Sequence, residues 1–550
     1  MNTDRAEVVV IGAGLGGLSA ASYLAKAGYA VTVLEHHAVP GGYAHEFRRG
    51  KYRFEVALHA LDGIDAGGWT QAVFADLDVL SQVEFCRLDP YFVGRFPGHE
   101  VVAHLDPEKY RDALAAQFPH EAEGLRRLCA DMELVFRQGQ QVVMETKLAG
   151  LSMGGSLGRF PEFAEALALT WSAYLDRFVC DSRLRAMVSA LWGYFGVPPS
   201  RLGATTYILA WGSYHLTGAG YPLGGSMAMS RALERTIKRH GGKILYRQTV
   251  NRIVVDRGLA VAVETEQGLR VEARMFVSNA SPKDTMLRLL DSGSVAKDYF
   301  QKIEADPASL GSFVVYLALD CELSALGWAH HEVILFETYD LEADYAYCAS
   351  GDWRRCMLAL TYYNHADPGC SPPGGSSLAL MTLAPWDYEN EWGTGGSRHQ
   401  YRKNPRYNEI KNAAAEILID RAAAVIPGLR EHIKYCDVST PLTNYRYTRN
   451  PRGAIYGSVS TALRASSDLP SNETPIPNLF LAGAWVTGGG GGMSAALMSG
   501  AGTAIKARSA MRAQEEAQPG AQTAYGAEPA AMSDDELARL LMQELRGGGA

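Results

Sequence analysis

The sequence predicts an α/β fold in which a parallel-sheet domain is interrupted by a second domain of mixed sheet and helices. Three observations predict it. An apolar strand near the N-terminus runs straight into a glycine turn and a helix, two more glycine-bearing segments lie in the middle and near the end of the chain, and helix-rich or strand-rich stretches separate them. Of the 550 residues, 47% are hydrophobic and 20% charged, so a disordered or fibrous chain is excluded.

The first element is the apolar run Val8–Ile11, which is typical of a strand buried on both faces. A G-x-G-x-x-G turn follows it at once. A helix is expected from Leu18 to Lys26, ended by Gly28, and a second strand over Val31–Leu34. Strand, turn, helix and strand in this order within about 30 residues predict a dinucleotide site.

Each glycine of the turn has a physical role. Gly12 allows the tight turn, Gly14 lets the backbone approach a pyrophosphate, and Gly17 lets helix and strand pack closely; Leu15 and Gly16 complete the turn. The free N–H groups at the start of the helix bind the anion.

The second strand ends at Glu35, whose carboxylate can accept hydrogen bonds from a ribose diol and repels a 2′-phosphate. The expected adenosine therefore lacks that phosphate. We expect His36 and His37 in the adenosine pocket and not in a metal site. The pair Gly41-Gly42, with Tyr43 and Ala44, favours FAD over NAD, although an ordinary Pro-Gly turn is the alternative explanation.

Three separated blocks then carry a resemblance. The first runs from Val8 to His59, the second from Tyr221 to Pro282, and the third from Thr440 to Gly500. In this order they resemble the FAD-dependent carotenoid oxidoreductases, which include phytoene desaturases, plant-type carotenoid isomerases and retinol saturases. The resemblance implies a Rossmann-type FAD-binding domain of the glutathione-reductase kind.

The resemblance also implies cofactor contacts outside the first turn. Leu58 and His59 would pass the isoalloxazine, and Val250 would offer backbone hydrogen bonds to the adenine. The remaining contacts would come from Ala280, Gly483, Ala484, Gly490, Gly492 and Met493. Ala484 stands where many members of the wider superfamily carry an acid that touches the ribityl chain. A helix beginning at Met493 would stabilise negative charge on reduced flavin.

Periodicity and the blocks together predict the domains. The discontinuous FAD-binding domain takes 1–100, 215–300 and 435–511, and the substrate domain takes 101–214 and 301–434. We expect a helix over Phe163–Val179, a three-stranded meander within 253–273 and a strand over Ser312–Asp320. Residues 512–550 are predicted to form a flexible linker and a short amphipathic helix whose apolar stripe is Leu537, Leu540, Leu541 and Leu545.

A flavin moves a hydride at N5, so the substrate site should be an apolar tunnel beside that ring. His59 is the first candidate for a proton donor, with a hydrogen-bonded core histidine as the alternative. Tyr214 and His215 are weaker candidates, within an aromatic stretch that begins at Trp192. Arg446 and Arg449 could bind a polar head of the substrate or form surface ion pairs.

The expected function is FAD-dependent desaturation, isomerisation or saturation of a long apolar polyene. The alternatives are a tailoring enzyme for polyketide polyenes, a flavin amine oxidase and a non-catalytic flavoprotein. The electron partner is left open between NAD(P)H, a quinone and oxygen. A net charge of −8 argues against nucleic-acid binding. The eight scattered cysteines argue against a zinc ribbon or an iron–sulfur cluster. We expect a cytoplasmic protein, with peripheral membrane contact and a partner for the C-terminal helix as further options.

Overall fold

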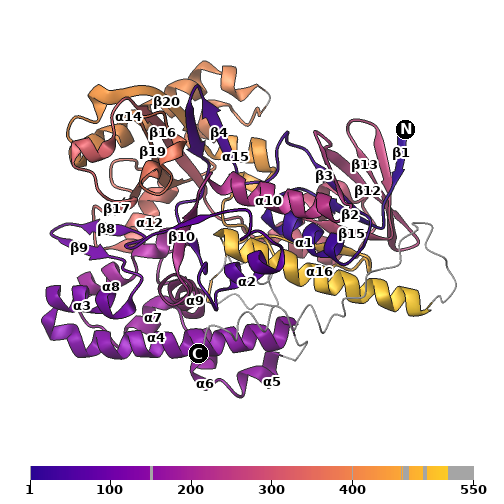
Figure 1. The fold of residues 1–550 in the computed structure, drawn as a ribbon, viewed down its shortest axis with the longest axis horizontal. Coiled ribbons are helices and arrows are strands. Elements are labelled where there is room, and N and C mark those ends of the chain that lie inside the picture. Colours follow the sequence, from indigo (N-terminus) through magenta and orange to yellow (C-terminus); the bar gives the residue numbers. More distant parts are fainter. Residues whose placement is uncertain are drawn as a thin grey trace.

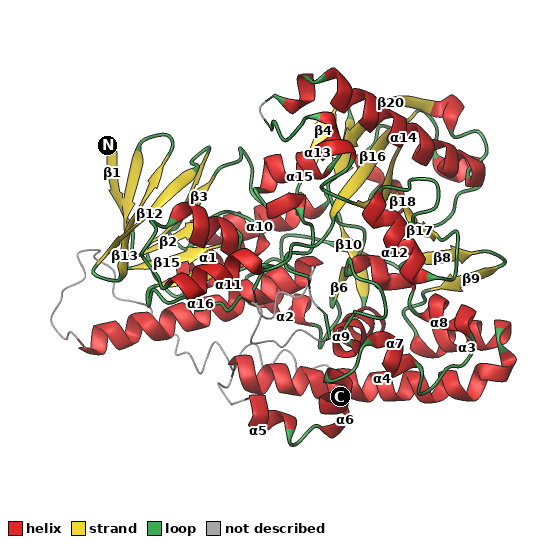
Figure 2. Ribbon diagram, turned by 180° about the vertical axis from the view of Figure 1, so that it is seen from behind, coloured by secondary structure: helices red, strands yellow, loops and turns green. Residues whose placement is uncertain are grey.

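The computed structural model describes residues 2–148, 153–398, 400–459, 461–462, 470–486 and 492–517. Two bodies lie side by side in Figure 1. A parallel sheet with its covering helices and a small second sheet lies at one end, and a larger mixed sheet above a layer of helices lies at the other. Figure 2 shows the same division from behind.

The parallel sheet has the strand order β11-β3-β2-β15-β21. Its strands are β2 (Val8–Ile11), β3 (Val31–Glu35), β11 (Lys243–Tyr246), β15 (Met275–Ser278) and β21 (Leu479–Leu481), and all its pairs are parallel. Helix α1 (Leu15–Lys26) packs against α10 (Ser226–Arg239) and α16 (Gly492–Ala517). The strand–turn–helix unit is confirmed, but α1 begins three residues before the predicted Leu18.

The two faces of β2 pack on different cores. Val8 and Val10 belong to the large core on the side of α1, whereas Val9 and Ile11 belong to a smaller core shared with a second sheet. That sheet has the order β1-β14-β13-β12, with β12 (Val250–Asp256), β13 (Leu259–Thr265), β14 (Leu269–Glu272) and β1 (Asn2–Arg5). The predicted meander is present, and the polar N-terminus adds a fourth strand, parallel to β14, that was not predicted.

The larger sheet has the order β20-β16-β19-β18-β17-β8-β9. Its strands are β8 (Val93–Phe96), β9 (His99–Val102), β16 (Gly311–Leu319), β17 (Glu332–Leu335), β18 (Leu358–Tyr362), β19 (Ser376–Ala384) and β20 (Ile433–Ser439). The predicted domain limits near residues 100 and 435 therefore cut through the β8–β9 hairpin and through β20. The hairpin joins this sheet because β8 pairs with β17.

Helices cover one edge of this sheet: α3 (Pro107–Gln117), α4 (Ala122–Val143), α5 (Met153–Leu157), α6 (Pro161–Leu167), α7 (Trp171–Leu175), α8 (Ser182–Val188) and α9 (Ala204–His215). The single helix predicted over Phe163–Val179 is wrong, because α6 and α7 are separate. Thr170 caps α7 by accepting a hydrogen bond from the Ala173 N–H, and the Trp171 N–H donates to Leu202 outside the helix.

The remaining elements connect the two bodies or cover them. They are the hairpin β4 (Glu46–Arg49) and β5 (Tyr52–Glu55), the three-stranded sheet of β6 (Leu61–Asp62), β7 (Phe85–Arg87) and β10 (Ala219–Pro222), and the helices α2 (Trp69–Asp76), α11 (Lys297–Ala305), α12 (Leu341–Ser350), α13 (Glu389–Gly393), α14 (Pro405–Val425) and α15 (Pro441–Thr448).

Helix α16 corrects the predicted start of the C-terminal linker. It continues to Ala517, past the predicted end at residue 511, because Met511 is buried and Glu515 forms an ion pair with Arg274 at 3.3 Å. The predicted amphipathic helix with Leu537 lies outside the described residues. Within the described ranges, no helix combines the length and apolar composition that spanning a bilayer requires.

Close packing of α16 on α1 gives a stability test. A Cβ on Gly500 would lie 2.2 Å from the Gly16 carbonyl oxygen, whereas a Cβ on Gly502, two residues along the same helix, would meet nothing within 4 Å. We expect Gly500→Ala to lower the free energy of unfolding by about 1–3 kcal/mol, as overpacking does. Gly502→Ala should raise it by up to about 1 kcal/mol through helix propensity. Urea unfolding checks both, and equal effects of the two variants would contradict the packing.

Candidate functional site

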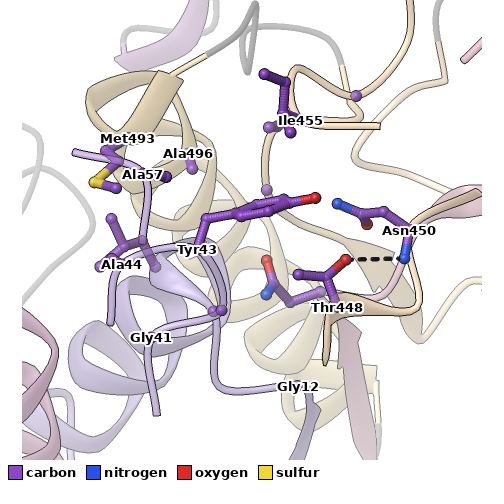
Figure 3. A pocket seen from close by; sticks show the side chains of 18 of the residues that line it. Gly12, Gly41, Tyr43, Ala44, Ala57, Thr448, Asn450, Ile455, Met493 and Ala496 are labelled. Carbon is purple, nitrogen blue, oxygen red and sulfur yellow. Dashed lines mark hydrogen bonds between the residues drawn. The ribbon is translucent and has the colours of Figure 1, made fainter. Parts of the chain in front are cut away.

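A large pocket opens where the carboxyl ends of the parallel strands meet the larger sheet. It encloses about 1800 Å³ of space free of protein atoms, part of it open to solvent. Segments far apart in the sequence line it together: Gly12 to Gly16, Gly41 to Ala44, Val56 to Asp62, Gln248 to Val250, Tyr447 to Gly457 and Gly483 to Trp485. Figure 3 shows Tyr43 reaching across it between Gly41 on one wall and Asn450 and Ile455 on another.

The glycine turn is held against the end of β15 by one side chain, Asn279. A Cβ on Gly14 would lie 2.6 Å from the Asn279 Nδ2, and a Cβ on Gly16 would lie 2.6 Å from its Oδ1 and 2.7 Å from the Gly483 Cα. Gly483 has φ +102°, and a Cβ added there would also lie 2.6 Å from the Asn279 Oδ1. Only glycine therefore fits at these three positions, and the backbone of the turn stays bare toward the pocket.

The second glycine segment joins the first through the backbone. The Gly41 N–H donates to the Ala13 carbonyl at 2.7 Å. Gly41 and Gly42 both have positive φ, and a Cβ on Gly41 would lie 2.0 Å from the Ala44 carbonyl oxygen. Glycine is therefore required at both positions, because the chain adopts positive φ there as it passes beside Gly14.

Glu35 lies at the end of β3 with its carboxylate held by backbone groups. Its Oε2 accepts from the Ala13 N–H and its Oε1 from the His37 N–H, both at 2.7 Å. Beside it the His36 Nε2 lies 2.8 Å from the Tyr447 carbonyl oxygen. Val250, the first residue of β12, lines the same part of the pocket.

One part of the pocket wall is built around His59, which is 9% exposed. Its Nδ1 lies 2.5 Å from the Thr361 Oγ1 and its Nε2 lies 3.0 Å from the Met381 Sδ. Burial, with a smaller effect of the neighbouring His331, lowers the pKa of His59 to about 3. Tyr194, Tyr214 and Met381 line the pocket beside this ring.

At the start of α16 a carboxylate joins three elements. Asp62 on β6 accepts from the Ser213 hydroxyl of α9 at 2.6 Å and from the Ser494 hydroxyl of α16 at 2.7 Å. Met493 and Ala496 of the same helix face the pocket (Figure 3). The position of α16 relative to α9 is therefore fixed beside the pocket.

The structure brings together nearly all the residues that the sequence singled out for a cofactor. On the pocket wall lie Gly12, Gly14, Leu15, Gly16, Glu35, His36, Gly41, Gly42, Tyr43, Ala44, Leu58, His59, Val250, Ala280, Gly483, Ala484, Gly492 and Met493. Gly17 lies behind the wall, where a Cβ would be 2.1 Å from the Gly12 carbonyl oxygen. Gly490 lies outside the described residues.

The three candidate catalytic residues do not all lie at the pocket. His59 and Tyr214 line the pocket, but His215 does not. Its ring packs against Tyr91 and Trp211 in the core, because successive residues of a helix point about 100° apart. Of the aromatic stretch from Trp192 to Tyr214, Tyr194 and Tyr214 reach the pocket, and Arg449 lines it whereas Arg446 does not.

Several residues of the site were not assigned a role from the sequence. Asn279 directly follows β15, a strand that was not predicted; the apolar run Met275–Val277 is the signal that could have indicated it, and the parallel pairing of β15 with β2 places Asn279 beside the glycine turn. Thr361 and Met381 lie on β18 and β19, about 300 residues after His59, and nothing in the sequence links them to it. Burial also raises the pKa of Glu332, behind His59, to about 8.

The pocket fits a dinucleotide. The first N–H groups of α1 have no partner within the helix, no acid lies in its first turn, and the bare backbone of Gly14 and Gly16 leaves room for a pyrophosphate. The Glu35 oxygens each have a further lone pair for a ribose hydroxyl. The rest of the pocket, from Leu58 to Ala496, is broad enough for a flat ring system.

Known proteins share this architecture. All-trans-retinol 13,14-reductase of Danio rerio is 25% identical over 509 residues, covering 87% of this chain and 82% of that protein. Prolycopene isomerase 1 of an Oncidium hybrid cultivar is 26% identical over 508 residues, covering 87% and 80%. The crystal structure of an oxidoreductase from Methanosarcina mazei has the same fold, with 19% identity, a TM-score of 0.58 and coverage of 90% of this chain and 99% of that one.

The family described as flavin containing amine oxidoreductase matches residues 15–506, which include most of both bodies and all of the described pocket lining except Ile11, Gly12 and Gly14. FAD is the cofactor of this protein. The chain belongs to the flavin containing amine oxidoreductase family.

Proposed function

We propose that this protein is an FAD-dependent oxidoreductase that acts on a C=C bond of a long apolar conjugated polyene. One observation carries the proposal: a single pocket runs from the dinucleotide cradle at Gly14 to a wall of Leu58, Tyr194, Tyr214 and Met381. Bound flavin supplies hydride transfer at N5, and such a wall suits an apolar chain beside it. The retinol reductase and the prolycopene isomerase support a retinoid or carotenoid-like substrate.

The residues of the cradle divide the cofactor between them. Gly12, Gly14, Leu15 and Gly16 at the N-terminus of α1 would hold the pyrophosphate, and Glu35 the adenosine ribose. Val250 and His36 would contact the adenosine. The segments Gly41–Ala44 and Leu58–His59, together with Gly483, Ala484, Gly492 and Met493, would enclose the isoalloxazine and its ribityl chain.

The sequence relatives favour a polyene over an amine as the substrate. The retinol 13,14-reductase and the prolycopene isomerase, each aligned with 87% of this chain, are named for polyene substrates. The acids on the described pocket wall are Glu35, Asp62 and Asp284. Glu35 accepts from two backbone N–H groups, Asp62 accepts from two serine hydroxyls, and Asp284 forms an ion pair with Arg288 at 2.8 Å.

The cofactor assignment is tested by the colour of the protein. We expect the purified chain to be yellow and to release intact FAD on denaturation. Gly16→Ala should lower the bound FAD at least tenfold, because its Cβ meets the Gly483 backbone at 2.7 Å. Gly502→Ala, whose Cβ meets nothing within 4 Å, is the control and should keep its FAD. Release of NAD in place of FAD would refute the assignment.

The substrate class is tested by anaerobic turnover. Protein reduced with dithionite should be reoxidised by all-trans-retinol or a carotenoid, with a product heavier by two hydrogens, or should isomerise a cis-carotene without net redox change. The oxidised protein should not be reduced by putrescine or cyclohexylamine. Reduction by an amine, with no response to any polyene, would replace the proposal with amine oxidation.

The role of His59 is tested by comparing turnover with cofactor content. His59→Gln should lower turnover by roughly 10²–10⁴-fold, the usual contribution of a general acid or base, and leave FAD content close to that of the parent. His215→Gln is the comparison, because this side chain is buried away from the pocket. This variant should lower the stability of the protein more than it lowers turnover per bound FAD. Parallel loss of FAD and turnover in His59→Gln would assign the histidine a structural role.

A further inference from the structure

A buried carboxyl group lies directly behind His59. Glu332 on β17 is 1% exposed, and its Oε2 accepts a hydrogen bond from the Tyr194 hydroxyl at 2.7 Å. Its Oε1 has no hydrogen-bond partner among the described residues and lies 3.6 Å from the His59 Nδ1. In the described part of the chain, no lysine or arginine forms an ion pair with it. An acid in this position has no structural partner that requires its charge.

The neighbours of His59 fix which ring nitrogen carries its hydrogen. The Met381 sulfur only accepts, so the Nε2 that faces it at 3.0 Å carries the hydrogen. The Nδ1 is then an acceptor, and it faces both the Thr361 hydroxyl and the free oxygen of Glu332. Because Met381 lines the pocket, the Nε2 hydrogen lies on the pocket side of the ring and Glu332 on the other side.

The surroundings keep this pair uncharged. Burial raises the pKa of Glu332 to about 8, and the Tyr194 hydrogen bond opposes the shift only in part. Burial lowers the pKa of His59 to about 3 and that of the adjacent His331 to about 4. The other titratable groups near Glu332 are tyrosines whose pKa values burial raises, so they stay neutral: Tyr91, Tyr194, Tyr214, Tyr363 and Tyr456.

We propose that Glu332 is the proton reservoir of the active site and that His59 passes its proton to the substrate carbon. The inference rests on the proposed function and deepens it, because saturation of a C=C bond needs one proton for each hydride. His59, which touches the pocket, is the catalytic residue of the pair, and Glu332 acts through it.

The proton balance is complete. Bound reduced flavin would supply a hydride to one alkene carbon, which would leave the π electron pair on the other carbon. That carbon takes the Nε2 proton of His59, while Nδ1 takes the carboxyl proton of Glu332 and leaves a carboxylate. The Oε1–Nδ1 distance must shorten by about 0.5 Å for this transfer. Afterwards a proton from solvent enters at Nε2, and the Nδ1 proton returns to Glu332.

Glu332→Gln tests the reservoir, because it keeps the shape and a carbonyl oxygen for Tyr194 but has no acidic proton. We expect product formation by the reduced holoenzyme with all-trans-retinol or a carotenoid to fall roughly 10²–10⁴-fold. The double variant Glu332→Gln/His59→Gln should be no slower than the worse single variant, since residues that act as a unit are not additive. Multiplicative losses, or a Glu332→Gln rate within threefold of the parent, would overturn the proposal.

Asp344 provides the matched control. It is 0% exposed, and burial raises the pKa of its carboxyl as well, but it lies on α12 and does not line the pocket. Asp344→Asn should keep the parental rate per bound FAD. FAD content and thermal midpoint are measured for every variant, so that loss of fold is separated from loss of proton transfer. A rate loss in Asp344→Asn equal to that in Glu332→Gln would overturn the specific role of Glu332.

Infrared spectroscopy gives a readout that needs no turnover. At pH 7 the difference spectrum of the parent minus Glu332→Gln should show the C=O band of a protonated carboxyl, because the contribution of Asp344 is the same in both proteins, and this band should be lost as the pH rises through about 8. Absence of that band from the parent would overturn the reservoir even if polyenes are reduced. If the band is present but no polyene reacts, the proposed substrate class fails while the protonated Glu332 stands.

Discussion

The site depends on one packing constraint, which is the fit of the Asn279 side chain among three glycines. β2, β15 and β21 are parallel neighbours, so the chain leaves all three at the same edge of the sheet. The amide of Asn279 fills the space that a Cβ on Gly14, Gly16 or Gly483 would occupy. The glycine turn before α1 and the end of β21 at Gly483 are thereby held at one separation beside the pocket in which we propose that the flavin binds.

The second body supplies what the parallel sheet lacks. A sheet that is covered on both faces can hold a nucleotide at its edge. The proposed flavin ring also needs a wall of protein on its far side to enclose a substrate. That wall comes from β18 and β19 through Thr361 and Met381, with Glu332 of β17 behind it. Because these three strands are neighbours in the antiparallel part of the mixed sheet, their side chains reach His59 together. The chemistry is thus assembled from both bodies, whereas cofactor binding is concentrated in one.

Local sequence patterns predicted most of the parallel-sheet body of the fold. The run Val8–Ile11, the glycine turn and Glu35 act within about 30 residues, so spacing alone predicts their geometry. Two kinds of feature were not predicted from the sequence. β1 is polar and short, and it is a strand only because the β14 edge is open to it. The contacts of His59 span about 300 residues and depend on the register of distant strands, which no periodicity reports. Tyr214 lines the pocket and His215 does not, because adjacent residues of a helix point in directions about 100° apart.

The carboxylate of Asp62 has a consequence for the stiffness of one side of the pocket. One of its oxygens accepts a hydrogen bond from α9 and the other accepts one from α16. Moving these helices apart would break both hydrogen bonds and leave a partly buried carboxylate without these donors, which costs free energy. Widening of the pocket is therefore opposed at the point where Asp62 lies between α9 and α16.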